Sequence, residues 1–165
     1  MIAPVHEDSK LIDLAQARAV QYLVAIKHER DMEQLTVWLS SRTYLRSVHL
    51  ALVHVVKPEW LEHDAESGLG GFRMLSAVEK NTMNNLEMLE MGASNIREQF
   101  PQVEVDYWIR IGDPLTVLPE IARCINADAL LVFGGSPEDR PFWERSFAQR
   151  IANKCPCPLE CFARH

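Results

Sequence analysis

The segment from Val103 to Ser136 constrains the fold of this chain more than any other stretch. Its first part, Val103 to Ile111, is rich in β-branched and aromatic residues, which is typical of a β-strand. The tripeptide Gly112 to Pro114 then turns the chain into a helix, because glycine allows a tight turn, aspartate caps free amides and proline suits the first helical position. Apolar residues recur at helical spacing, and Ala129 to Phe133 follows as an unbroken apolar run. The segment therefore predicts a strand, a helix and a parallel strand in one right-handed crossover.

Apolar segments elsewhere also have the pattern of strands, and amphipathic helical segments alternate with them. The other predicted strands are Ala19 to Lys27, Ser47 to Val56 and, near an edge of the sheet, Cys157 to Ala163. The predicted helices begin at Asp31 through a capping box with Gln34, run from Leu75 to Phe100, and run from Phe142 to Asn153. Residues 57–71 are expected to form a loop. This alternation predicts an α/β domain with a parallel sheet and helices on both faces.

Length and charge narrow the classes of function. The 165 residues and the 47% apolar content are typical of one domain with a continuous core, with residues 1–18 as an N-terminal extension and 19–165 as the domain. The net charge of −6 argues against partners rich in phosphate, so neither nucleic acid nor a membrane surface is expected. No apolar run is long enough to span a membrane and no signal peptide is visible, so a cytoplasmic protein is expected.

Four short motifs in the second half resemble those of the universal stress protein family. They are Ile111 to Pro114 (Ile-Gly-Asp-Pro), Asn126 to Asp128 (Asn-Ala-Asp), Leu130 to Gly134 (an apolar strand ending in glycine) and Cys157 to Pro158. They occur in the family's order and at similar spacing, and Leu50 to Val56 matches the family's second strand. The resemblance implies a five-stranded parallel sheet of order 3-2-1-4-5, a Rossmann-like fold of the adenine nucleotide alpha hydrolase type.

The resemblance also implies a place for a ligand. In the nucleotide-binding branch of the family, ATP lies between the ends of the first and fourth strands, where the strand order reverses. An aspartate after strand one serves the adenosine, and a glycine-rich loop after strand four wraps the phosphates. The positions implied here for ligand binding are Ala25, Lys27, Val55, Phe133, Gly134, Ser136, Arg145, Ser146 and Phe147.

This chain departs from the nucleotide-binding pattern at most of its steps. Lys27 occupies the aspartate position, and Pro137, which has no amide hydrogen, occupies the position of the second glycine. Arg145 replaces a later glycine, although Ser146 keeps the hydroxyl that follows it. The loop is also shorter than the family's, and the acidic pair Glu138–Asp139 puts negative charge where phosphates would lie. The sequence therefore predicts a chain that does not hold ATP tightly.

Three interpretations of the basic residues near this crevice stay open. Lys27, Arg140 and Arg145 can be solvated charges or partners of nearby acids, they can clamp a different small anion, or they can serve ATP or AMP. The resemblance favours a stress-response or signalling protein that acts by binding, and its alternative is an ATP or AMP switch with weak or no hydrolysis. An enzyme of the same superfamily would need a phosphate loop after strand one, which the segment Lys27 to Arg30 does not supply.

Other polar residues are interpreted as structural, and no catalytic residue is predicted. His49 and His54 have opposite parity in one strand, so they face opposite sides of the sheet, and His54 is expected to be structural. Asp106 is expected to be an exposed strand residue and Asp113 a helix cap. Pro119 lies within a predicted helix and is expected to bend it.

The cysteines and methionines near the predicted core are also interpreted as structural. Cys157 and Cys161 lie about 13 Å apart in an extended strand, too far to share a metal ion, so no metal site is expected. Buried, reduced thiols are expected instead. The methionines of the long helix are expected to belong to the core, with an exposed contact surface as the alternative; they are Met74, Met83, Met88 and Met91. The family implies a homodimer, which the last strand, Cys157 to Ala163, would form by pairing with its twin.

Overall fold

The computed structural model describes residues 19–42, 47–57, 70–133 and 142–162, and within them the side chains outside 70–80 and 142–147. Strands and helices alternate through these residues, as the hydrophobic pattern predicts. The strands are β1 (Val20–Ala25), β2 (Val48–Val56), β3 (Val103–Ile111), β4 (Ala129–Phe133) and β5 (Leu159–Phe162). The helices are α2 (Glu29–Ser40), α4 (Gly70–Gln99), α5 (Pro114–Cys124) and α6 (Phe142–Lys154).

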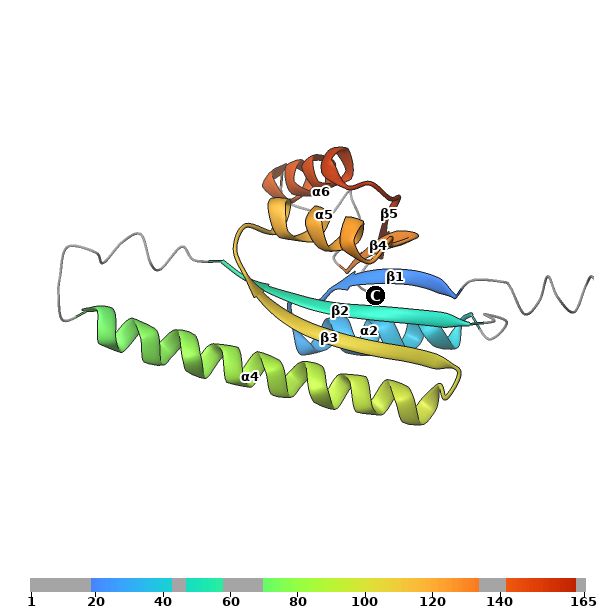
Figure 1. Cartoon of the computed structure of the whole chain (residues 1–165), viewed down its shortest axis with the longest axis horizontal. Helices are drawn as coiled ribbons and strands as arrows, with labels where there is room; N and C mark the ends of the chain where they lie inside the picture. The colour runs from blue at the N-terminus through green and yellow to red at the C-terminus, as the bar shows by residue number, and fades with distance from the viewer. Residues whose placement is uncertain (1–18, 43–46, 58–69, 134–141, 163–165) are drawn as a thin grey trace, which may run out of the picture.

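The strands form one parallel sheet with the order β3-β2-β1-β4-β5. Figure 1 shows α5 and α6 on one face of this sheet and α2 and α4 on the other. The strand order and the three-layer arrangement confirm the fold that the motif resemblance implies. The order reverses between β1 and β4, which lie side by side at the centre of the sheet.

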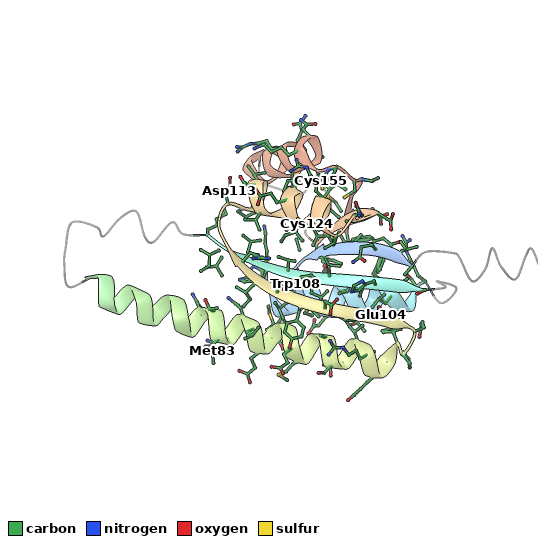
Figure 2. The ribbon with its side chains drawn as sticks, in the orientation of Figure 1. Met83, Glu104, Trp108, Asp113, Cys124 and Cys155 are labelled. Atoms are coloured by element: carbon green, nitrogen blue, oxygen red, sulfur yellow. The ribbon has the colours of Figure 1, made fainter. Side chains whose placement is uncertain are left out.

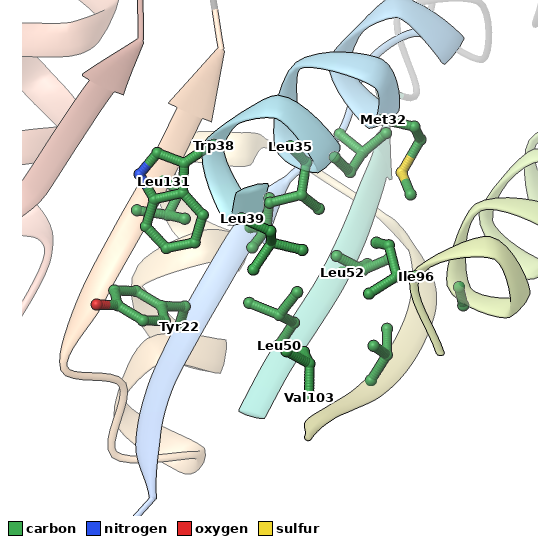
Figure 3. Close-up of a cluster of buried hydrophobic side chains, with 14 of the residues drawn as sticks. Tyr22, Met32, Leu35, Trp38, Leu39, Leu50, Leu52, Ile96, Val103 and Leu131 are labelled. Carbon is green, nitrogen blue, oxygen red and sulfur yellow. The ribbon is translucent and has the colours of Figure 1, made fainter. Parts of the chain in front are cut away.

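The central strand β1 is buried on both faces, which explains its continuous apolar run. Val24 faces α2 and α4, and its neighbour Leu23 faces α5 and α6; both are completely buried. Figure 3 shows the α2 side of this core, where Leu35 and Trp38 pack onto the sheet. Leu131 of β4 belongs to the same cluster. The amphipathic spacing of α2 therefore predicts its buried face correctly.

The tripeptide after β3 has the local structure that the sequence predicts. Gly112 has a φ of +152°, which side-chain-bearing residues rarely adopt, and a Cβ atom there would lie 2.8 Å from Val117 Cγ2. Asp113 is the N-cap of α5, and its Oδ1 accepts a hydrogen bond from the Leu115 amide at 3.1 Å. Pro114 follows at the first helical position. These residues therefore fix the entry into the crossover helix.

The Asn-Ala-Asp motif connects the end of α5 to the start of β1. Asn126 has a φ of +51°, a left-handed conformation that asparagine tolerates well at helix ends. The Ala127 amide then donates to the Ala122 carbonyl at 2.9 Å. The Asp128 amide donates to the Gln21 carbonyl at 2.7 Å, and Asp128 Oδ2 accepts from the Gln21 amide at 2.8 Å. The motif therefore has a structural role, because its hydrogen bonds position the start of β4 beside β1.

The structure corrects several predicted boundaries. α2 begins at Glu29 with His28 as its N-cap, so Asp31 lies in the first turn and not at its start. α4 begins at Gly70, five residues before the prediction, and takes the last residues of the predicted loop; residues 58–69 lie outside the described residues, as does the extension 1–18. β5 is shorter than predicted, because the chain bends before Leu159 and proline supplies no amide donor at Pro158.

The expectation that the methionines of α4 belong to the core is wrong for two of them. Met83 is 67% exposed and Met91 is 60% exposed, whereas Met88 packs partly against the core. Met91 lies two residues from the fully buried Leu89, which places it about 200° around the helix. The side chain of Met74 lies outside the described set. Among residues 81–99 of α4, whose side chains are described, the buried ones form a stripe that includes Leu89 and Ile96.

Pro119 lies inside α5 and is buried. The helix continues past it to Cys124, so the missing amide hydrogen does not end the helix there. The bend expected at Pro119 stays a prediction.

Candidate functional site

The candidate site is the crevice at the carboxyl ends of β1 and β4. In the register of these two strands, Ala25 lies opposite Val132, the residue before the last in β4. The strand order reverses here, because α2, which follows β1, and α6, which follows β4, lie on opposite faces of the sheet (Figure 1). In sheets of this kind ligands bind at such a point, and binding here stays a prediction.

The structure places three of the predicted site residues on two faces of the sheet and a fourth just beyond β1. Ala25 and Val55 are partly buried and belong to the cluster under α5 and α6. Phe133 is the last residue of β4, but its ring belongs to the cluster under α2 and packs against Phe162 with centroids 5.5 Å apart. Lys27 follows β1 and is exposed. Phe133 therefore brings its backbone to the end of β4, but its ring lies on the opposite face of the sheet from Ala25.

The structure describes no side chain of the remaining predicted site residues. Gly134 and Ser136 lie outside the described residues. Arg145, Ser146 and Phe147 lie in the first half of α6, and their side chains are outside the described set. Their roles stay predictions.

A buried carboxylate lies where β1 leads into α2. Asp31 is completely buried, and its Oδ2 accepts hydrogen bonds from the Lys27 amide at 2.8 Å and the His28 amide at 3.1 Å. Its Oδ1 has no hydrogen-bond partner among the residues that the structure describes. The carboxylate thus occupies two backbone donors at the carboxyl end of β1. Sequence reasoning identified Asp31 as a cap, but missed that it reaches backward from the first turn.

His54 links β2 to the end of β1. Its Nδ1 lies 2.8 Å from the Ile26 carbonyl oxygen. Because a carbonyl oxygen can only accept, Nδ1 carries the hydrogen, and Nε2 is the unprotonated nitrogen in the neutral ring. This contact supports the structural role that was predicted for His54, since it holds the backbone at the point where Lys27 leaves the sheet.

A second histidine contacts a carboxylate far from the crevice. His49 Nε2 lies 2.6 Å from Asp106 Oδ2, on the neighbouring strand β3. Both residues lie in the first half of their strands, whereas the crevice is at the opposite, carboxyl edge. The pair was missed because the two residues are 57 positions apart and only the strand register brings them together.

Two surface cavities lie away from the crevice. One, of about 660 Å³, lies between α2 and α4 and is lined by residues that include Met32, Thr36 and Met88. The other, of about 420 Å³, lies between β3 and α5 and is lined in part by Trp108 and Ile121. Figure 2 labels Trp108 on β3. Neither cavity is lined by the carboxyl ends of β1 and β4.

In the described part of the chain, no three His, Cys, Asp or Glu residues are grouped so that they could hold a metal ion. No helix among these residues is long and apolar enough to cross a membrane.

Comparison with known proteins identifies the fold. No family model matches the sequence, and no curated protein matches it. Solved structures do match: universal stress protein UspA from Lactobacillus plantarum has a TM-score of 0.64 at 13% identity, and the match covers 89% of this chain and 99% of that one. A universal stress protein family member from Burkholderia pseudomallei has a TM-score of 0.61 at 17% identity, with 87% and 96% covered. One from Arabidopsis thaliana, solved with AMP bound, has a TM-score of 0.54 at 20% identity, with 88% and 92% covered. The chain therefore has the fold of solved universal stress proteins.

Proposed function

We propose that this chain is a divergent universal stress protein that acts in a stress response or in signalling by binding, without catalysis, and that its crevice does not hold ATP tightly. Support for the family comes from the shared fold together with the Gly-Asp-Pro and Asn-Ala-Asp motifs, which have defined structural roles in this chain. Support for binding without catalysis comes from Asp31 and His54, whose side chains hold the backbone at the end of β1.

The arrangement of Asp31 carries the part of the proposal that concerns ATP. In the nucleotide-binding branch of the family, the end of the first strand serves the adenosine, and a ligand held there needs backbone amides that are free to donate. Here the carboxylate of Asp31 accepts from the Lys27 and His28 amides, so these two donors are already occupied. Lys27 also stands in place of the aspartate that serves the adenosine. The substitutions of glycine by Pro137 and Arg145 act in the same direction.

The direct test is to look for nucleotide in the purified protein. The chain is denatured, the supernatant is analysed for released nucleotide, and fresh protein is then titrated with ATP and with AMP in a thermal-shift assay. A ligand at 100 times its dissociation constant stabilises a protein by about 2.7 kcal/mol, so binding at the concentrations used is readily seen. We expect no released nucleotide and no shift with ATP. The universal stress protein from Archaeoglobus fulgidus that was solved in complex with dAMP serves as the positive control.

The second candidate function is a nucleotide-dependent switch. The observation that favours it is that several structures of the same fold contain nucleotides: AMP in the Arabidopsis thaliana protein, dAMP in the Archaeoglobus fulgidus protein and cAMP in another universal stress protein. Each of these ligands has a single phosphate, which needs fewer backbone donors than a triphosphate. A shift with AMP but not with ATP would therefore support this candidate, and a shift with ATP would contradict the proposal above.

We further propose that the chain forms a homodimer through β5. This strand lies at an edge of the sheet, so one side of its backbone has no partner strand among the described residues. Contacts with α2 and the residues after it hold β5 in place. Phe162 packs on Trp38 with ring centroids 5.7 Å apart, and Glu160 Oε2 lies 3.7 Å from Arg42 Nη2. The ion pair reduces the cost of placing the charge of Glu160 near an interface.

The dimer is tested by substituting the exposed Cys161 in β5. Cys161→Lys places like charges across a two-fold axis, so we expect a shift from dimer to monomer in sedimentation equilibrium. Cys124→Lys is the matched control, because Cys124 is also exposed but lies at the end of α5. A wild-type chain that sediments as a monomer would contradict this part of the proposal.

A further inference from the structure

Two cysteine side chains meet at the junction of α6 and β5. The sulfur atoms of Cys155 and Cys157 lie 3.4 Å apart. Both residues are half-buried and pack against the hydrophobic cluster beneath α5 and α6. Cys124 and Cys161, the other two cysteines, are exposed. Figure 2 labels Cys155 beside α6 and Cys124 on α5. The expectation that Cys161 is a buried core thiol is therefore wrong, and the two half-buried thiols form a pair instead.

The two sulfur atoms are close enough to bond after a small movement, and the backbone on either side of them is anchored. A disulfide has an S–S length of about 2.05 Å, so the two sulfurs need to approach by about 1.4 Å. On one side, the Cys155 amide donates to the Ile151 carbonyl at 2.9 Å and continues the hydrogen bonding of α6. On the other side, the Leu130 amide donates to the Pro158 carbonyl at 2.9 Å and ties the chain to β4. The approach is therefore confined to the bend at Pro156 and to the two cysteine side chains.

We propose that Cys155 and Cys157 are a reversible dithiol–disulfide pair, and that their oxidant is a low-molecular-weight disulfide of the glutathione type. The proposal is independent of the crevice and of its ligand. It depends on the contact between the two sulfur atoms, on their half-buried position and on the single residue that separates them.

The two cysteines have different roles in the exchange. Burial, followed by the neighbouring Cys155 thiol, raises the pKa of Cys157 from 9.0 to about 12, so Cys157 keeps its proton at neutral pH. The thiolate is the attacking species in thiol–disulfide exchange, so the first attack falls to Cys155. Cys157 acts second, and its proximity to Cys155 favours that intramolecular step.

The exchange balances in two steps. Cys155 Sγ loses its proton and attacks one sulfur of the oxidant R–S–S–R; that S–S bond breaks, and one RS⁻ leaves and takes up a proton. Cys157 Sγ then loses its proton and attacks Cys155 Sγ in the mixed disulfide, which forms the Cys155–Cys157 bond and releases the second RS⁻ as RSH. The two protein sulfurs lose two electrons, the oxidant gains them, and the two thiol protons end on two RSH molecules.

The experiment uses the full chain and glutathione disulfide. In the double variant Cys124→Ser/Cys161→Ser, only the pair remains. We expect incubation to remove both alkylatable thiols and to lower the intact mass by two hydrogen atoms, and dithiothreitol to reverse both changes. Adding Cys157→Ser should stop the reaction at one glutathione adduct on Cys155. A pair that stays alkylatable, or adducts without closure of the bond, would overturn the proposal.

The wild-type chain provides a second measurement that does not depend on any variant folding. After oxidation and alkylation, cleavage after Lys154 and Glu160 releases residues 155–160 and separates them from Cys161. We expect this fragment to be unalkylated and two hydrogen atoms lighter than its reduced form. A disulfide that instead joins two chains, or that involves Cys124 or Cys161, would contradict the assignment.

Discussion

The buried carboxylate of Asp31 allows a quantitative test of the turn that shapes the crevice. Asp31→Ala removes two hydrogen bonds to a charged acceptor, from the Lys27 and His28 amides. Each such bond contributes about 1.5–3 kcal/mol to stability. The substitution also removes the buried Oδ1, which has no hydrogen-bond partner and costs about 1–3 kcal/mol in the wild type. The central values of these ranges leave a net fall in the free energy of unfolding of about 2.5 kcal/mol.

Asp31→Asn separates hydrogen bonding from charge. The amide oxygen can still accept from the two backbone amides, but a neutral bond contributes only about 0.5–1.5 kcal/mol. We therefore expect Asp31→Asn to lower the free energy of unfolding by less than Asp31→Ala does. Glu29→Ala is the matched control, because Glu29 is an exposed acid in the same helical turn and its loss should change stability by no more than about 0.5 kcal/mol.

Two measurements check this reasoning. Urea denaturation gives the change in stability, provided that the slope of the transition stays constant. Hydrogen exchange at the Lys27 and His28 amides reports on the bonds themselves, and we expect both amides to exchange faster in Asp31→Ala. If these amides stay as protected as in the wild type, or if Asp31→Ala costs less than Glu29→Ala, the role given to Asp31 is wrong.

Three further predictions concern the fold. Gly112→Ala should lower stability by at least about 1 kcal/mol in urea denaturation, because alanine disfavours a φ of +152° and its Cβ would lie 2.8 Å from Val117 Cγ2; an unchanged midpoint would contradict this. Leu131→Ala should cost about 2–5 kcal/mol, whereas Leu86→Ala, at a residue that is 38% exposed, should cost clearly less in the same assay. Because the pKa of Cys157 is raised from 9.0 to about 12, the folded state keeps the thiol proton between these pH values while the unfolded state loses it. The contribution of this thiol to the free energy of unfolding is therefore fully present below pH 9 and is lost as the pH rises toward 12. Cys157→Ser should therefore flatten the fall in stability between pH 9 and 12, measured by urea denaturation at each pH, and an unchanged slope would refute it.

The sheet was predictable because parallel strands buried on two faces leave continuous apolar runs in the sequence. The turn residues were equally informative, since Gly112 and Asp113 have the backbone roles that their chemistry suggests. The faces of α4 were less predictable. Apolar residues occur around much of this helix, and hydrophobicity alone does not tell that Met83 and Met91 point away from the sheet.

The candidate site was predictable in position but not in detail. The strand order puts Ala25 and Phe133 at one edge of the sheet, as expected, but strand parity sends the Phe133 ring to the other face. The contact between His49 and Asp106 depends on the register of β2 against β3, which no local pattern specifies. The contact between Cys155 and Cys157 depends on a bend around Pro156. The prediction treated Cys157 as part of an extended strand, and that geometry does not bring it close to Cys155.

The shortness of β4 and β5 determines how the thiol pair and the crevice lie relative to each other. Leu130 lies opposite Leu159 at the amino edge of this pair, next to the thiols, and Phe133 lies opposite Phe162 at the carboxyl edge, next to the crevice. A ladder of this length spans only about 10 Å. The thiol pair and the crevice therefore lie at the two ends of one short pair of strands, and the tests of the thiols and of ATP binding address opposite ends of the same strands.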